Sequence, residues 1–147
     1  MTIRLLGVDD IRAYLTHMLE VDQDSGQDGI HFTSHSADEP YDLDAAVERE
    51  RARWTTPVTG DHWRRAWGWF VDGAQVGHLY LHGGMMPSAR HRVSMGMGVH
   101  RDHRRKGGGS ALLKASVDWA SDQPGIDWVD LGVFEGNAPA EALYRGF

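Results

Sequence analysis

The sequence contains no cysteine, and this absence excludes several chemistries at once. A disulfide scaffold, a thiolate zinc site, an iron–sulfur cluster and a cysteine nucleophile all need that residue. Long hydrophobic runs are also missing, and the first residues pass directly into a charged segment without the apolar stretch of a signal peptide. We therefore expect a cytoplasmic protein that does not associate with membranes.

Basic residues are absent from one long stretch and crowded into another. Residues 13–48 contain no lysine or arginine but carry nine acidic side chains, whereas residues 90–106 hold a basic cluster. The members of the basic cluster are Arg90, Arg92, Arg101, Arg104, Arg105 and Lys106. The net charge is −6, which is unlike a nucleic-acid-binding protein. A local positive field on an acidic chain favours one compact anionic ligand over a polyanion.

The size and composition indicate one folded domain over residues 1–147. The 147 residues fit the usual size of a single domain, and 41% hydrophobic residues are enough for a core. Strands are predicted near 3–6, 63–71, 76–81, 92–99 and 128–134, and helices near 9–22, 42–54, 110–120 and 139–144. A mobile acidic loop is predicted at 23–40. The pattern predicts an α+β fold with helices on both faces of a mostly antiparallel sheet.

Local signals support these boundaries. Asp9 is predicted to cap the first helix, and Asp72-Gly73 lies between two β-rich runs. Because both residues of that dipeptide tolerate positive φ, the sequence predicts a tight hairpin there. The tryptophans at 54, 63, 67 and 69 are predicted to lie mainly in the core, with one or two of them open to an acceptor pocket.

The segment with the most chemical information runs from residue 93 to residue 113. It combines a strand, a polar loop, three consecutive glycines (Gly107, Gly108 and Gly109) and an amphipathic helix. Glycines allow close approach of the backbone to a ligand, and a helix N-terminus offers unpaired N–H groups to phosphate. Neither the Walker nor the dinucleotide-binding spacing is present, since Lys106 precedes the glycines and no βαβ fingerprint surrounds them.

Two motifs resemble those of the GCN5-related N-acetyltransferase (GNAT) superfamily. The run from Arg104 to Gly109 resembles the family's Arg/Gln-x-x-Gly-x-Gly/Ala signature. Downstream, a strand is followed by Asn137, by Ala140 three positions later and by Tyr144 seven positions later, as in that family. The resemblance implies an enzyme, an N-acetyltransferase that uses acetyl-coenzyme A as co-substrate.

The resemblance also implies roles for individual residues. The pantetheine arm of acetyl-coenzyme A would lie along the fourth strand, at Met97, Gly98 and Val99, in a gap where this strand splays from the strand containing Leu131. Main-chain N–H groups of the glycine loop would bind the pyrophosphate, with Arg104 opening the motif. The residues of that loop are Arg105, Lys106, Gly107, Gly108, Gly109 and Ser110. Asn137 would contact the pantetheine, and Tyr144 would protonate the leaving thiolate.

The base that deprotonates the amine is not identified by the motifs. Some relatives carry a glutamate at the position of Val93 and others at the position of Gly132, and neither is present here. His91 lies on the strand face of Val93 and Asp130 on that of Gly132, so either residue or a water remains a candidate. The missing glutamates also leave open a non-catalytic acyl-coenzyme A binding or sensing module.

Further expectations concern the acceptor, metals and the end of the chain. Direct attack by a primary amine of a small molecule or protein is predicted, and the acidic stretch favours a cationic acceptor. The nine histidines include pairs four residues apart, such as His78 and His82, but a strand separates such residues by about 13 Å, so no metal is expected. The family's Gly-Phe pair would fall beyond Phe147, so a further C-terminal strand is expected there. The sequence leaves open whether the chain forms a homodimer.

Overall fold

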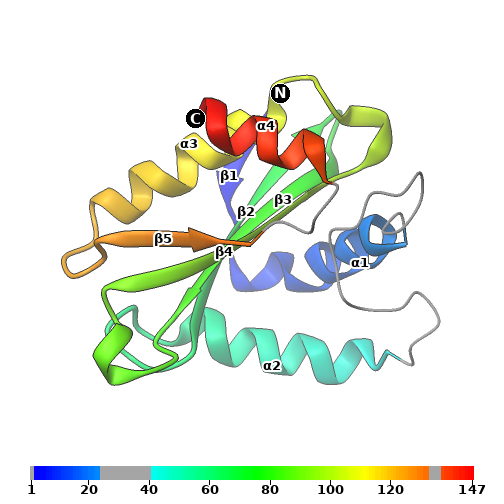
Figure 1. The fold of residues 1–147 in the computed structure, drawn as a ribbon. Coiled ribbons are helices and arrows are strands. Elements are labelled where there is room, and N and C mark those ends of the chain that lie inside the picture. The colour runs from blue at the N-terminus through cyan, green and yellow to red at the C-terminus, as the bar shows by residue number, and fades with distance from the viewer. Residues whose placement is uncertain (1, 24–40, 133–136) are drawn as a thin grey trace.

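A five-stranded sheet lies between two helical layers in the computed structural model, which describes residues 2–23, 41–132 and 137–147 (Figure 1). The strands follow the order β1 Thr2–Leu5, β2 Trp63–Val71, β3 Ala74–Gly83, β4 Arg92–Val99 and β5 Trp128–Leu131. Neighbouring strands are antiparallel, except that β4 and β5 are parallel. The predicted α+β class with a mostly antiparallel sheet is confirmed.

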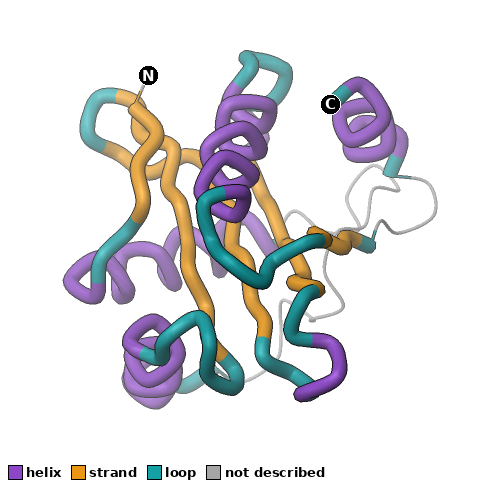
Figure 2. The backbone as a smooth tube through the Cα atoms, turned by 90° about the vertical axis from the view of Figure 1, so that its left-hand side faces the viewer, coloured by secondary structure: helices purple, strands orange, loops and turns teal. Residues whose placement is uncertain are grey.

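The helices divide between the two faces of the sheet. The α-helices are α1 Ile11–Asp22, α2 Leu43–Thr55, α3 Gly108–Ser121 and α4 Ala138–Gly146, and short 3₁₀ turns cover Val8–Asp10, Pro87–Ala89 and Arg101–His103. The α1 and α2 helices lie on one side of the sheet, and α3 and α4 lie on the other (Figure 1). The tube view shows α4 standing beside the β5 edge, separate from α3 (Figure 2).

The predicted hairpin is present, with Asp72 at φ 50° and Gly73 at φ 80° joining β2 to β3. Both values lie in the left-handed region, as the type I′ turn requires. The second helix is capped by Asp42, whose side chain accepts a hydrogen bond of 3.1 Å from the N–H of Ala45. These two elements form from local sequence because the turn and the cap need only adjacent residues.

Two predicted boundaries are corrected by the structure. Asp9 does not cap the first helix: a 3₁₀ turn intervenes, and the Asp10 carboxylate accepts from the Gly7 N–H at 2.8 Å and from Arg4 at 2.9 Å. The third helix begins at Gly108, two residues before the predicted start, so two of the three glycines are helical. The β5 strand ends at Leu131, and Gly132 is not part of it. Residues 133 and 134 of the predicted strand and most of the predicted acidic loop lie outside the described residues.

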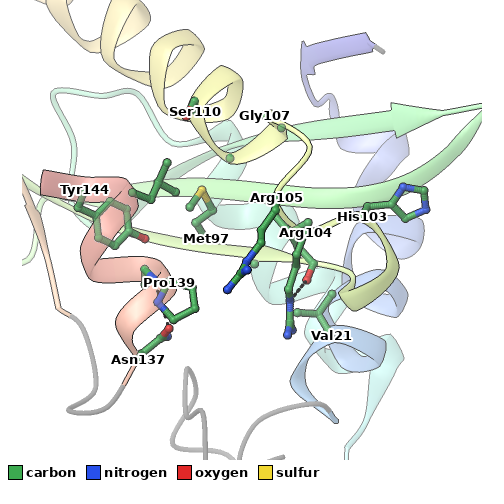
Figure 3. A pocket seen from close by; sticks show the side chains of 16 residues that line it. Val21, Met97, His103, Arg104, Arg105, Gly107, Ser110, Asn137, Pro139 and Tyr144 are labelled. Carbon is green, nitrogen blue, oxygen red and sulfur yellow. Dashed lines mark hydrogen bonds between the residues drawn. The ribbon is translucent and has the colours of Figure 1, made fainter. Parts of the chain in front are cut away.

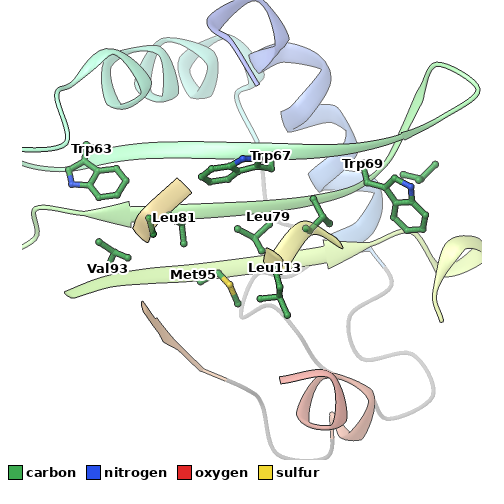
Figure 4. Close-up of a cluster of buried hydrophobic side chains, with 11 residues drawn as sticks. Trp63, Trp67, Trp69, Leu79, Leu81, Val93, Met95 and Leu113 are labelled. Carbon is green, nitrogen blue, oxygen red and sulfur yellow. The ribbon is translucent and has the colours of Figure 1, made fainter. Parts of the chain in front are cut away.

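The larger core lies between α3 and the sheet. Trp63, Trp67 and Trp69 line β2 and pack with aliphatic residues of β3, β4 and α3 (Figure 4). Each of these tryptophan side chains is at most 3% exposed, and Trp54 in the second core is 7% exposed. All four tryptophans predicted for the core are therefore buried, and the structure leaves none of them open to an acceptor.

Because side chains alternate along β4, its two faces carry different residues. Val93 and Met95 point into the core beneath α3, so Ser94, Gly96 and Gly98 face the α1–α2 side. Aromatic rings from β3 cover the two glycines: a Cβ on Gly98 would lie 2.6 Å from the His78 ring, and one on Gly96 would overlap the Tyr80 ring. On the α1–α2 face of β4, Arg92 and Ser94 are therefore the residues with side chains, since the other two positions are glycines.

A buried pair of histidines joins α1 to β3 on this face. His17 Nε2 lies 3.0 Å from His78 Nδ1, and the residues are 4% and 3% exposed. Burial lowers the pKa of His17 to about 4, and burial together with His17 lowers the pKa of His78 well below 6.5. Both rings are therefore neutral at neutral pH.

We expect the fold to lose stability in mild acid because of this pair. The unfolded chain binds protons at these histidines below pH 6.5, whereas the folded chain resists protonation down to the lower pKa values, so stability falls as the pH drops. For His17 alone the loss is roughly 2 kcal/mol by pH 5. Urea unfolding at pH 8, 6.5 and 5 measures this slope.

The double variant His17→Gln, His78→Asn tests the source of the slope. It should flatten the pH dependence whatever its absolute stability, because the groups that take up protons on unfolding are gone. His91→Gln, at an exposed residue, is the control and should keep the wild-type slope. If the free energy of unfolding of the double variant depends on pH as strongly as that of the wild type, groups other than this histidine pair cause the acid sensitivity.

Candidate cofactor site

A cavity of about 490 Å³ lies between β4, the start of α3 and α4 (Figure 3). Most of the residues predicted to bind cofactor line it. They are Met97, Gly98, Val99, Arg104, Arg105, Gly107, Gly108, Gly109, Ser110, Asn137 and Tyr144. Lys106, also predicted, is exposed on the same loop but does not line the cavity. Segments distant in the sequence thus form one site.

The loop before α3 presents the free N–H groups of a helix N-terminus. Gly107 occupies the N-cap position at φ 84° and has no side chain to cap the first turn. The first amides of a helix have no carbonyl partner within the helix, and they carry partial positive charge. Arg104 Nε donates to the Val99 carbonyl at 3.2 Å and ties this loop to the end of β4. The loop has the properties of an anion-binding site.

Two glycines of the motif allow close packing that larger residues would prevent. A Cβ on Gly108 would overlap the ring of Trp69, so only glycine lets α3 start this close to β2. A Cβ on Gly109 would lie 3.0 Å from Leu143 Cδ2 and 3.6 Å from Met97 Cε, within the cavity. Gly108 therefore positions the helix, and Gly109 keeps the space between β4 and α4 open.

Strand β4 keeps an edge available along the cavity. Among the described residues, β5 pairs with β4 only from Arg92 to Met95. Beyond this point Met97, Gly98 and Val99 line the cavity, while their other edge remains paired with β3. An extended ligand with amide groups could add to this edge as a strand does.

Helix α4 contributes the polar groups on the opposite wall. Asn137 is buried and caps α4, since its side-chain oxygen accepts from the Ala140 N–H at 3.3 Å. Tyr144 lies on the same helix, across the cavity from Met97 (Figure 3). Burial raises the pKa of Tyr144, so its hydroxyl keeps its proton at neutral pH. Tyr144 can act as a proton donor.

The structure does not bring either predicted base to the cavity. Asp130 accepts two hydrogen bonds from Arg92, at 2.9 and 2.6 Å, and this partner lowers the pKa of Asp130. His91 is exposed before the start of β4, on the strand face that α3 covers. Val93 is 1% exposed in the core, so a glutamate at that position would point away from the α1–α2 face.

Five residues of the cavity were not predicted from the sequence. Val21 comes from α1, His103 from the loop after β4, and the others from α4. The α4 residues are Pro139, Ala140 and Leu143. Helical spacing from Tyr144 could have indicated Ala140, but nothing in the local sequence links Val21 to a site eighty residues away.

Part of the acidic stretch serves the fold. Asp42 caps α2, and Asp44 pairs with Arg12 of α1 at 2.6 Å. Asp24 and Asp28 lie outside the described residues. Within the described residues there is no group of three or more histidines and carboxylates arranged to hold a metal ion, and no helix long and apolar enough to span a membrane.

Comparison with known proteins places the chain in a family. The model of the acetyltransferase (GNAT) family matches residues 29–147. The L-amino acid N-acetyltransferase AaaT of Escherichia coli K12 is 30% identical over 77 residues, which cover 52% of this chain and 48% of that protein. The match thus spans about half the length of that relative.

Solved structures agree with the fold. A GNAT-family acetyltransferase from Streptococcus pneumoniae has a TM-score of 0.82 at 18% identity, covering 99% of this chain and 81% of its own. The structure of yncA from Salmonella typhimurium with acetyl-CoA has a TM-score of 0.75 at 21% identity, covering 99% of this chain and 77% of its own. The chain belongs to the GNAT acetyltransferase family, as the motifs predicted.

Proposed function

We propose that the protein transfers an acetyl group from acetyl-coenzyme A to a primary amine. The observation that carries this proposal is one cavity that joins the glycine loop, Tyr144 and the edge of β4 that β5 leaves beyond Met95 in the described part of the chain. The loop would bind the pyrophosphate, the edge from Met97 to Val99 would bind the pantetheine amides, and Tyr144 would lie near the sulfur. The acetyl-CoA-bound relative supports the choice of co-substrate.

The acceptor class follows from the chemistry of the thioester and from the relatives. A thioester is attacked readily by a neutral amine, and the matching E. coli protein is an L-amino acid N-acetyltransferase. We propose direct attack within a ternary complex, with no acyl-enzyme step; the chain has no cysteine that could carry the acetyl group as a thioester. The neutral amine nitrogen bonds to the thioester carbon, the C–S bond breaks, Tyr144 supplies a proton to the thiolate, and the proton lost by the nitrogen passes through solvent to restore Tyr144.

Calorimetry with coenzyme A, followed by a thiol-release assay, tests this function. We expect binding of coenzyme A and release of free thiol from acetyl-coenzyme A with at least one member of an amine panel. The panel should contain amino acids, polyamines, aminoglycosides and lysine peptides, so that the cationic preference suggested by the acidic stretch is measured too. No heat with coenzyme A would remove the proposal.

A second function, a non-catalytic acyl-coenzyme A sensor, is motivated by one observation. The two positions where relatives carry a glutamate base hold Val93, which is buried, and Gly132, and neither residue has an ionisable side chain. A sensor would bind coenzyme A tightly and release no thiol with any amine of the panel. The same two measurements therefore separate the two functions.

A further inference from the structure

The reacting end of the proposed cofactor slot lies where β5 leaves β4. If the nucleotide binds at the glycine loop, the pantetheine runs along β4 from Val99 towards Met97, so the thioester lies near the last β4–β5 pair, Met95 with Leu131. Helices α3 and α4 cover one face of the sheet at this end (Figure 1). An acceptor amine must therefore approach across the α1–α2 face.

Two β3 residues face this approach. His82 pairs in register with Ser94, and Tyr80 pairs with Gly96, so their side chains lie on the α1–α2 face one strand away from the end of the slot, outside the residues that line the cavity. The rings of Tyr80 and His82 have centroids 5.9 Å apart, and a Cβ on Gly96 would overlap the end of the Tyr80 ring. His82 is partly exposed, in contrast to the buried His78.

Four other described bases on this face are already engaged. His78 is buried against His17, Asp130 accepts two hydrogen bonds from Arg92, and Glu50 accepts from Arg64 at 2.8 Å. His100 lies at the far end of β4, where its Nδ1 accepts from the Asp102 N–H at 3.3 Å. His82 is thus the partly exposed imidazole nearest to the separation of β4 and β5 on the described part of this face.

We propose that His82 is the catalytic residue that accepts the proton of the acceptor ammonium, an inference that rests on the proposed acetyltransferase function. The proton moves from nitrogen to the His82 imidazole, and the neutral amine then attacks the thioester carbon. As the C–S bond breaks, Tyr144 gives its proton to the thiolate, the second proton of the nitrogen passes through solvent to restore Tyr144, and His82 later releases the first proton to solvent. One proton is released in each turnover.

The surroundings keep His82 in its base form. Burial lowers the pKa of His82, and the cations Arg64 on β2 and Arg53 on α2 lower it further. Glu50 on α2 faces the same region, but its carboxylate is held by Arg64 and by the indole N–H of Trp54 at 3.1 Å. Tyr80 lies on one side of His82, and the Arg92–Asp130 pair lies beyond Ser94. A neutral imidazole near pH 7 is ready to accept a proton.

The test compares His82→Gln with two matched variants, His91→Gln and Asp130→Asn, at saturating acetyl-coenzyme A. We expect kcat of His82→Gln to fall by about 100-fold, with the affinity for coenzyme A unchanged. Its rate should rise steadily with pH, because the amine must then lose its proton to solvent, whereas the wild type should reach a plateau. Both matched variants should retain wild-type rates. His82→Asn is a second variant in case glutamine disturbs packing.

The outcomes separate this inference from the proposed function. Absence of coenzyme A binding or of turnover in the wild type would remove the proposed function itself. An active wild type with a His82→Gln variant of equal rate and equal pH profile would overturn the role of His82 alone. Loss of activity in Asp130→Asn or His91→Gln, with His82→Gln unaffected, would assign the proton to that residue instead.

Discussion

Replacing Gly109 with leucine should abolish coenzyme A binding while the protein stays folded. Gly109 lies in the first turn of α3 without a positive φ, so the backbone accepts a side chain there. The new side chain would extend between Met97 and Leu143 into the space proposed for the cofactor. We expect Kd to rise at least about 100-fold, which corresponds to about 3 kcal/mol.

Calorimetry with coenzyme A and a thermal melt measure the two parts of this prediction. Gly146→Leu is the matched control, because a Cβ there meets no atom within 4 Å and the residue does not line the cavity. The control should bind coenzyme A as the wild type does. Wild-type affinity in Gly109→Leu would show that the cofactor does not occupy this cavity.

The second large effect is expected for Tyr144→Phe. The variant keeps the ring packed against the larger core but removes the hydroxyl that we propose donates a proton to the thiolate. Loss of one general acid typically costs about 100-fold in rate, so kcat should fall by that order while Kd for coenzyme A stays constant. Steady-state kinetics and calorimetry give the two quantities.

The pH dependence adds a check on the same hydroxyl. Because burial raises the pKa of Tyr144, the group stays protonated through mildly alkaline pH, and wild-type kcat should not decline until the pH exceeds the usual tyrosine value of about 10. Tyr41→Phe, at an exposed residue, is the control and should be fully active. A Tyr144→Phe variant with wild-type kcat would leave Tyr144 with a packing role only.

The sequence alone determined the features that depend on neighbours along the chain. The Asp72-Gly73 turn and the glycine loop before α3 each need only a few adjacent residues with suitable backbone freedom, and both were predicted, whereas the equally local Asp42 cap was not. The alternation of strand and helix patterns was equally readable, and with it the sheet class. Two motifs in order were enough to indicate the family, which the family comparison then bore out.

Only the tertiary structure decided which face each side chain takes and what it meets there. Asp130 could serve as a base by sequence, but the parallel pairing of β5 with β4 brings it to Arg92. From the sequence, His82 was considered only as one of two histidines four residues apart on a strand. The strand register shows that it lies opposite Ser94. Contacts such as these join segments tens of residues apart, and no local preference encodes them, because they arise when the sheet assembles and its two cores are buried.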